Sequence, residues 1–242
     1  MRWLPRYLCA ACIPALSAGV AGSGCADNES TLFVRAVLRI EPPDCVAKPD
    51  PSATVMLGGT LDVALRDTYQ AALLIGTQLV RRGSRDQLRT ETSRVNLRGA
   101  EVYIDSAEGD NIYSFTIDGT GFADPGSSEE PGYGVMFVPL IPPSASRRID
   151  PGHVVTVRVK VFGRTLGGTE LESNELYFPI LVCSGCLVSF PIEADDPVEP
   201  GYVCGSNPDF TVTEDPPCWW GQDDAIPCTA CVGSDPGLCL EP

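Results

Sequence analysis

Apolar and polar residues alternate strictly along several short segments in the middle of the chain. The segment from His153 to Phe162 has valine at every second position, with threonine, arginine and lysine between the valines. The segment from Leu32 to Glu41 alternates in the same way, and we expect its apolar side chains to share one face: Leu32, Val34, Ala36, Leu38 and Ile40. A period of two residues is typical of a strand with one buried and one exposed face.

Other segments with apolar, β-favouring residues predict the remaining strands: Thr54–Leu57, Thr60–Leu65, Ala71–Val80, Val95–Asp105, Ile112–Asp118, Gly134–Leu140 and Glu175–Val182. Near Gly99 the apolar positions change parity, which predicts a β-bulge or two shorter strands. Clusters of glycine and proline separate the segments, and no segment shows the 3.6-residue period of an amphipathic helix.

This pattern predicts an all-β fold. We expect an antiparallel, immunoglobulin-like β-sandwich over residues 31–190, followed by a small disulfide-rich C-terminal extension. A minimal sandwich needs about 100 residues, so we assign the excess length to loops at Arg81–Arg94 and Gly119–Gly132. The acidic stretch Asp105–Asn111 predicts a hairpin turn, because it lacks the ligand spacing of a calcium loop.

The strand pattern stops after Phe190. Residues 191–201 are rich in proline and acidic side chains and predict a linker or an extended strap. Residues 202–242 form a cysteine-rich acidic tail with five cysteines. So small a unit cannot build an adequate apolar core, and we expect covalent cross-links to hold it.

The first 24 residues are organised as an export signal. Arg2 and Arg6 precede the uncharged, mostly apolar run Leu8–Val20, and small residues follow. This run is shorter than the about 20 residues that a membrane-spanning helix needs. Gly24-Cys25 then resembles the cleavage site of bacterial lipoproteins, in which a small residue precedes a cysteine that is lipidated and becomes the mature N-terminus. The resemblance implies a lipid anchor on Cys25, with residues 25–30 as a tether.

Other fates are compatible with the same residues. Lipoproteins usually have leucine or another aliphatic residue at the position of Gly22. Ordinary cleavage after Ala26 or Ala21 would give a freely secreted protein, and an uncleaved signal would remain as an anchor. The whole chain is similar in style to predicted lipoproteins of bacteria with GC-rich genomes, since it has 15 arginines and 2 lysines.

The cysteines divide at the end of the signal. Cys9, Cys12 and Cys25 lie within it or at its end, which leaves an even set of eight: Cys45, Cys183, Cys186, Cys204, Cys218, Cys228, Cys231 and Cys239. An even set in an exported chain predicts a disulfide framework of unspecified connectivity. If all eight pair, the five tail cysteines require a bond that leaves the tail, and Cys45 requires a partner at or beyond residue 183.

Two C-x-x-C pairs, Cys183/Cys186 and Cys228/Cys231, allow three interpretations. Four thiolates could complete a tetrahedral zinc site, and a single pair could be redox-active. Export favours structural disulfides instead. A redox role would also call for a thiolate beside cationic groups at a helix N-terminus, whereas the flanks here are β-like or acidic.

Acidic charge gathers in the C-terminal third. The chain has 17 basic and 32 acidic residues, and residues 165–242 hold 14 acidic residues but no lysine or arginine. Because nucleic acids and anionic headgroups require cationic contacts, we expect no nucleic-acid partner. Six arginines gather earlier, where they could bind an anionic envelope polysaccharide, pair with the acidic tail or face solvent: Arg81, Arg82, Arg85, Arg89, Arg94 and Arg98.

Few residues suggest chemistry directly. His153 is the only histidine, and we interpret it as a surface residue because no nucleophile motif accompanies it. Trp219-Trp220, close to two aspartates, could contact a sugar or a cationic ligand, or could form the small core of the tail. We name Trp219 and Trp220 as candidate ligand contacts, and we predict no catalytic residue, no metal and no cofactor.

These features together predict an exported, lipid-anchored, disulfide-stabilised module that binds a partner or supports the cell envelope without catalysis. We expect it at the outer membrane, on the periplasmic face or the cell surface, with the membrane and an envelope polysaccharide or protein as partners. Two alternatives are an exported hydrolase that uses paired carboxylates and a zinc-stabilised module.

Overall fold

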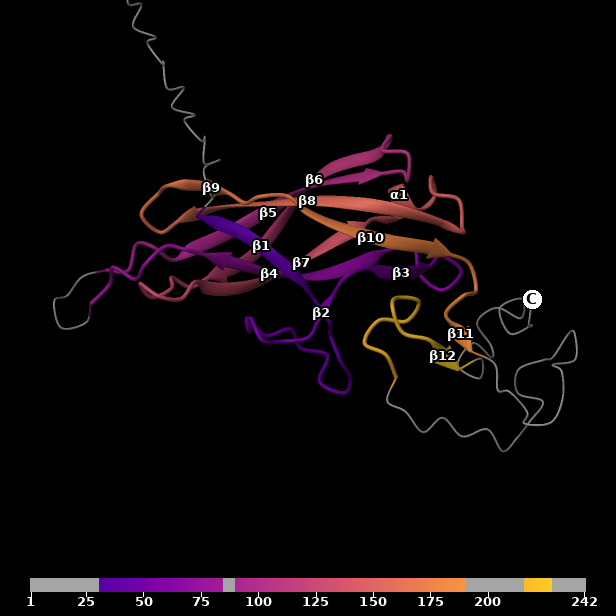
Figure 1. The fold of residues 1–242 in the computed structure, drawn as a ribbon, viewed down its shortest axis with the longest axis horizontal. Helices are drawn as coiled ribbons and strands as arrows, with labels where there is room; N and C mark the ends of the chain where they lie inside the picture. Colours follow the sequence, from indigo (N-terminus) through magenta and orange to yellow (C-terminus); the bar gives the residue numbers. More distant parts are fainter. Residues whose placement is uncertain (1–30, 85–89, 190–215, 228–242) are drawn as a thin grey trace, which may run out of the picture.

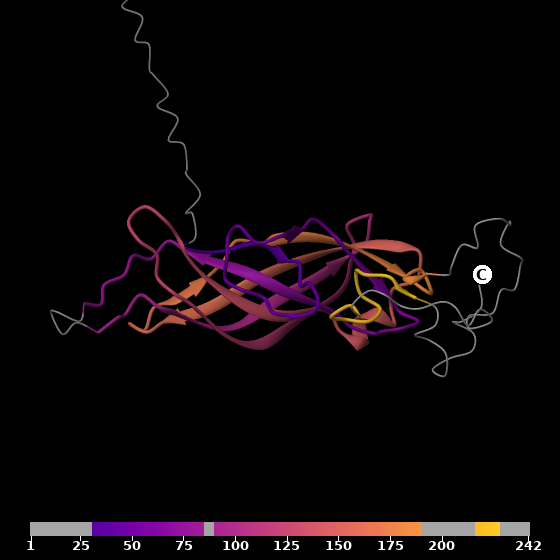
Figure 2. The same ribbon diagram turned by 90° about the horizontal axis from the view of Figure 1, so that it is seen from below.

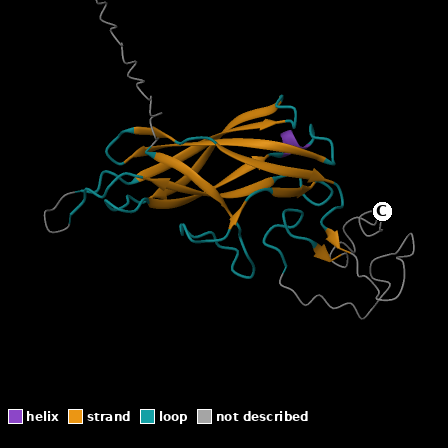
Figure 3. Ribbon diagram, in the orientation of Figure 1, coloured by secondary structure: helices purple, strands orange, loops and turns teal. Residues whose placement is uncertain are grey.

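The computed structural model describes residues 31–84, 90–189 and 216–227, which fold mainly into antiparallel β-sheets (Figure 1 and Figure 3). Several sequence-based predictions lie outside these residues. They are the export signal, the tether, lipidation at Cys25, the linker 191–201, most of the tail and four cysteines: Cys204, Cys228, Cys231 and Cys239. Among the described residues, no helix is long and apolar enough to cross a membrane.

Two sheets face each other. The smaller sheet has four strands, in the spatial order β2 (Val55–Met56), β1 (Leu32–Leu38), β4 (Tyr69–Thr77) and β7 (Gly132–Ile141). The larger has the order β3 (Gly59–Asp62), β10 (Leu176–Cys183), β8 (His153–Thr165), β5 (Val95–Asp105) and β6 (Asn111–Ala123), and β9 (Glu170–Glu172) pairs with β8. Only the pair β3–β10 is parallel in these two sheets.

Short elements complete the described part of the chain. A parallel pair forms between β11 (Val188–Ser189) and β12 (Ile226–Pro227). One helical turn, α1 (Pro143–Ser146), follows β7. The sequence pattern did not predict these elements or β9, because segments of two to four residues are too short to show a hydrophobic period.

The predicted alternation in β8 is confirmed. Its four valines at positions 155, 157, 159 and 161 are all at most 1% exposed and belong to the core between the sheets. Strand β8 pairs with β5 on one side and β10 on the other. In β5 the register shifts between Leu97 and Gly99, where the parity change predicted a bulge. The predicted turn after β5 is also present, with the Ser106 amide bonded to the Asp110 carbonyl at 2.8 Å.

The expectation that five alternate residues of the segment Leu32–Glu41 share one face is wrong. The register shifts between Val34 and Ala36. Beyond this bulge, Val37 enters the core between the sheets, whereas Leu38 and Ile40 join a second apolar cluster with Ala72 and Leu74 of β4. An extra residue in a strand reverses which side chains face inward, so the period-two pattern does not carry through it.

Strand β4 is buried on both faces. Leu73 packs in the core between the sheets and Leu74 in the second cluster, each 0% exposed. The partly buried residues that pack on the second cluster include Ala47 and Ala53 from the loop after β1, and Trp219 from the C-terminal segment. The indigo loop and the yellow segment accordingly lie on one side of the sandwich (Figure 1 and Figure 2). They form a partial third layer over the smaller sheet.

The loop predicted at Gly119–Gly132 begins later than expected, because β6 continues to Ala123. The glycines within β6 allow it to pass close to β7. An added Cβ at Gly119 would lie 2.6 Å from the sulfur of Met136, and one at Gly121 would lie 2.9 Å from the carbonyl oxygen of Val135. These glycines therefore permit a close approach of two strands instead of ending one.

Candidate functional site

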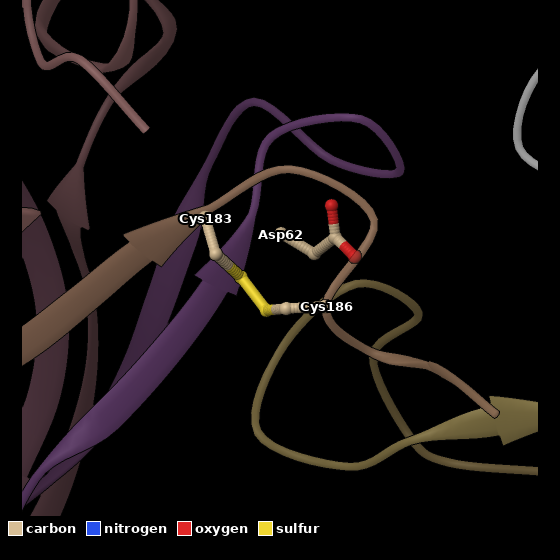
Figure 4. A group of neighbouring side chains, drawn as sticks. All are labelled: Asp62, Cys183 and Cys186. Carbon is tan, nitrogen blue, oxygen red and sulfur yellow. A yellow bond between two sulfur atoms is a disulfide. The ribbon is translucent and has the colours of Figure 1, made fainter. Parts of the chain in front are cut away.

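Asp62 and Cys183 meet at one end of the larger sheet. They are the last residues of β3 and β10, and they are paired in the parallel register of these strands. Because parallel strands run in the same direction, their carboxyl ends lie at the same edge. The chain then turns after Cys183, and the side chains of Asp62, Cys183 and Cys186 gather at the turn (Figure 4).

The Asp62 carboxylate organises this turn from within. It is 0% exposed, and its Oδ1 accepts hydrogen bonds from the backbone amides of Gly185 at 2.7 Å and Ala64 at 3.1 Å. Its Oδ2 accepts one from the amide of Leu187 at 2.9 Å. A buried carboxylate needs such partners, and charge-assisted hydrogen bonds are among the strongest in proteins. Asp62 therefore fixes the loop on both sides of Cys186.

Cys183 and Cys186 are joined by a disulfide. Cys183 is 7% exposed, whereas Cys186 is exposed to solvent. Their sulfurs and a carboxylate oxygen of Asp62 lie within 4.8 Å of one another, which is close enough for three metal ligands. Cysteine binds zinc as the thiolate, so the disulfide removes the two sulfurs from any zinc site while it remains closed. Cys228 and Cys231, the other half of the predicted zinc site, lie outside the described residues.

The C-terminal segment 216–227 docks beside this turn, against β3 and β4. The amide of Asp62 donates to the carbonyl of Gly221 at 2.9 Å. The side-chain amide of Gln222 makes two hydrogen bonds to the backbone of Gln70. Its oxygen accepts from the Gln70 amide and its nitrogen donates to the Gln70 carbonyl, both at 2.8 Å. Gln222 is only 3% exposed. The segment is therefore held by buried, paired polar groups.

Asp223 is the central side chain of this docking. It has a positive φ of 64°, a conformation that aspartate adopts more readily than most residues. Its Oδ1 accepts from the Thr60 amide at 2.9 Å, and both carboxylate oxygens lie 3.0 Å from the hydroxyl of Tyr69. Gln222 donates to Oδ2 at 3.1 Å. Tyr69 itself is 0% exposed, so its hydroxyl reaches the segment from inside the sandwich.

Burial dominates the protonation of this pair. It raises the pKa of the Asp223 carboxyl above its usual value, and hydrogen bonds from Thr60, Gln222 and Tyr69 offset the increase only in part. The neighbouring charge of Asp224 raises the pKa further. Burial also raises the pKa of the Tyr69 hydroxyl, as does the charge of Asp223. The tyrosine is therefore a hydrogen-bond donor to Asp223 throughout the physiological pH range.

A long-range disulfide fixes the same segment to the loop after β1. It joins Cys45 to Cys218 across 173 residues, with their Cα atoms 5.5 Å apart. The bond leaves the tail and supplies Cys45 with a partner beyond residue 183, as the cysteine count requires. Next to it, Trp219 packs on the second apolar cluster and meets the ring of Phe137 edge-on at 6.2 Å. Trp220 is 46% exposed.

An ion pair completes the docking. Arg39 lies 2.5 Å from the Asp224 carboxylate. These residues, with Tyr69 and Asp223, line a cavity of about 20 Å³, which is enough for one water molecule. Asp223 and Asp224 are adjacent carboxylates in different environments, since Asp223 bonds to Thr60 and Tyr69 and Asp224 pairs with Arg39. The two carboxylates serve here to hold the segment.

The other candidate residues lie apart from this site. His153 is exposed at the start of β8, and its Nδ1 lies 3.0 Å from the carbonyl oxygen of Asp150. This confirms its interpretation as a surface residue.

Two of the clustered arginines pair with acidic residues of the sandwich. Arg94 lies 2.8 Å from Asp124, and Arg98 lies 3.6 Å from Glu170. Arg85 and Arg89 lie outside the described residues. Within residues 31–84, 90–189 and 216–227, the arginine that pairs with the C-terminal segment is Arg39, which lies outside the cluster.

Sequence reasoning did not single out Asp62, Tyr69 or Gln222. One signal was available for Asp62, which is an acidic residue within the otherwise apolar run Leu61–Leu65. An acidic residue in a buried strand needs hydrogen-bond donors nearby, and therefore marks a place where another segment meets the strand. Tyr69 and Gln222 carry no comparable signal, because their roles depend on contacts across more than 150 residues.

No protein-family model, curated protein or solved structure matches this chain. Its function is therefore inferred from its own residues and contacts.

Proposed function

We propose that this protein is an exported immunoglobulin-like sandwich that acts at the cell envelope as a binding or structural module without catalytic activity. The observation that carries the proposal is the Cys45–Cys218 disulfide. Disulfides persist in oxidising compartments and are rare in the cytosol. A bond between sulfurs this far apart in sequence constrains the unfolded chain strongly, and so suits a protein that must last outside the cell.

The strand order supports the immunoglobulin-like part of the proposal. Such sandwiches place their first, second and fifth strands in one sheet and their third, sixth and seventh in the other. If the short strands β2, β3 and β9 are set aside, β1, β4 and β7 occupy the first set of places and β5, β8 and β10 the second. The remaining long strand, β6, lies beside β5 at the edge of the larger sheet.

The N-terminal sequence supplies the location. A signal over residues 1–24 directs export, and a lipid on Cys25 holds the protein at the outer membrane, facing the periplasm or the cell surface. Residue 31, where the described sandwich begins, follows Cys25 closely in sequence. The membrane is then one partner, and an envelope polysaccharide or protein is the other.

Trp220 is the better of the two candidate ligand contacts. Trp219 is committed to packing on Phe137 and the second apolar cluster. Trp220 is 46% exposed, and an exposed aromatic ring can stack on the apolar face of a sugar or contact a cation. Trp220→Ala should therefore weaken binding to envelope polysaccharide, whereas Trp219→Ala should chiefly lower the stability of the fold.

The intact mass of the protein isolated from membranes tests the location and the cross-links together. The protein would be denatured with a thiol-blocking reagent but without a reductant. We expect a chain that begins at Cys25, carries acyl groups and has no blocked cysteine. A Cys25→Ser variant is the control and should lack the acyl mass. A mass that begins at Asp27 or at a residue before Cys25, or several blocked cysteines, would contradict the anchored, disulfide-bonded module.

A further inference from the structure

The two sulfurs of the Cys183–Cys186 disulfide are unequally accessible. Cys183 is 7% exposed, and its Sγ lies 3.6 Å from the carbonyl oxygen of Leu61. Cys186 lies within the turn and is exposed to solvent (Figure 4). Because a nucleophile must reach the sulfur that it attacks, an external thiol can approach Cys186 but not Cys183.

The turn does not depend on this disulfide for its shape. Asp62 accepts hydrogen bonds from the amides of Gly185 and Leu187, which flank Cys186. The Val63 amide also donates to the Cys183 carbonyl at 2.8 Å. The bond closes a loop with only two residues between the cysteines, so it removes much less conformational entropy from the unfolded chain than Cys45–Cys218 does. It can therefore open and close while the turn stays in place.

We propose that Cys183–Cys186 is a thiol–disulfide exchange site at which an exported dithiol attacks Cys186. This goes beyond the function proposed above, and it does not depend on the lipid anchor. A reactive thiol would call for cationic groups beside its thiolate. The oxidised pair needs no activated thiolate of its own, because the incoming thiol supplies it.

The exchange balances in two steps. In the first, one thiolate of the dithiol forms a bond to Sγ of Cys186, the Cys183–Cys186 bond breaks, and its electron pair leaves on Sγ of Cys183, which takes a proton from solvent. In the second, the other thiolate of the dithiol attacks the dithiol sulfur that is bonded to Cys186. The mixed disulfide breaks, and Cys186 leaves as a thiolate that takes a proton from solvent. The dithiol is oxidised to a disulfide, and the cysteine pair gains two electrons and two protons.

The position of Cys183 makes the site selective for dithiols. Its sulfur, the sulfur of Cys186 and a carboxylate oxygen of Asp62 lie within 4.8 Å of one another. After attack by a monothiol, Cys183 stays beside the mixed disulfide because Asp62 holds the turn. Cys183 then expels the monothiol and restores the original bond. A dithiol completes the second step before this reversal.

Stepwise reduction of the native, full-length mature protein tests the proposal. The protein would be incubated with increasing dithiothreitol, blocked with an alkylating reagent, and mapped by peptide mass. We expect alkylation at Cys183 and Cys186 at concentrations that leave Cys45–Cys218 closed, with an unchanged circular dichroism spectrum. If the two bonds open together, if Cys45–Cys218 opens first, or if opening Cys183–Cys186 unfolds the protein, the proposal is wrong.

A matched pair of variants tests which sulfur reacts. Cys183→Ser leaves the exposed Cys186 thiol, and Cys186→Ser leaves the buried Cys183 thiol. With oxidised glutathione, Cys183→Ser should accumulate a stable adduct at least tenfold faster than Cys186→Ser. The wild-type protein treated with reduced glutathione should accumulate almost no adduct, because Cys183 expels it. Equal adduct formation in the two variants, or a persistent adduct on the wild type, would exclude the assigned roles.

Discussion

Asp223 shows how a single side chain can hold a segment at some cost in free energy. Its carboxylate is removed from much of the solvent and faces the hydroxyl of Tyr69. Burial destabilises the charged form of the carboxyl group, and this raises its pKa. The acid therefore favours docking more strongly when it is protonated than when it is ionised.

Replacing Asp223 by asparagine should change the pH dependence of unfolding. Since the pKa of Asp223 is raised by folding, the folded protein holds the proton more tightly. The resulting stabilisation is present at low pH and is lost as the pH rises through the folded-state pKa. Asp223→Asn removes this loss, and asparagine tolerates the positive φ. The variant should therefore gain stability relative to wild type as the pH rises through this range.

Urea unfolding at several pH values between about 4 and 8 measures this difference, a range that starts near the usual carboxyl pKa. Glu129→Gln, on an exposed loop, is the control and should leave the slope unchanged. A parallel pH dependence of Asp223→Asn and wild type would show that Asp223 does not titrate differently in the folded and unfolded states.

Among the elements, β8 and β4 show what a hydrophobic pattern can and cannot predict. The valines of β8 alternate because one face meets the core and the other meets solvent, so the sequence alone identified the strand. Strand β4 is apolar on both faces. Its sequence predicted a strand, but a continuous apolar run does not reveal what covers the second face. That cover comes from residues before and far after the strand.

Adjacent leucines of β4 allow a test of this cover. Leu73 faces the core between the sheets and Leu74 faces the outer layer, and both are 0% exposed. Truncation of a fully buried leucine costs about 2–5 kcal/mol. We expect both Leu73→Ala and Leu74→Ala to lower the free energy of unfolding by amounts in this range, as measured in guanidinium chloride. A nearly neutral Leu74→Ala would mean that the outer layer does not exclude water from this face.

The candidate site was less predictable than the strands. Sequence reasoning anticipated that Cys45 pairs with a cysteine beyond residue 183 if all eight cysteines form disulfides. It did not anticipate that the tail segment completes the hydrogen bonds of β3 and β4. Contacts between residues so distant in sequence have no periodic signature, and only the three-dimensional arrangement brings Gln222 and Asp223 to their partners.

On the scale of the whole molecule, the two described disulfides differ in what they stabilise. One spans 173 residues and the other spans three. In the chain-entropy model the longer closed loop stabilises the fold by about 5 kcal/mol and the shorter one by about 2 kcal/mol. Natural domains are stable by only about 5–15 kcal/mol, so the first bond is a substantial part of the total.

Paired serine variants check this difference. Cys45→Ser with Cys218→Ser should lower the free energy of unfolding by about 5 kcal/mol, because the unfolded chain regains the entropy of the long loop. Cys183→Ser with Cys186→Ser should cost at most about 2 kcal/mol. Both would be measured by denaturant unfolding without a reductant. If both pairs of variants lost equal free energy of unfolding, or if the shorter bond cost more, Cys45–Cys218 would not be the more stabilising disulfide.

The Cys45–Cys218 bond also decides how the molecule bears mechanical load. A tension applied to the two ends of the chain passes from Cys45 directly to Cys218, so residues 46–217 lie outside the path of the force. Of the strands in the two main sheets, only β1 precedes the bond, and it would peel from β4 under load. The rest of the sandwich is shielded even if both ends are attached to other structures.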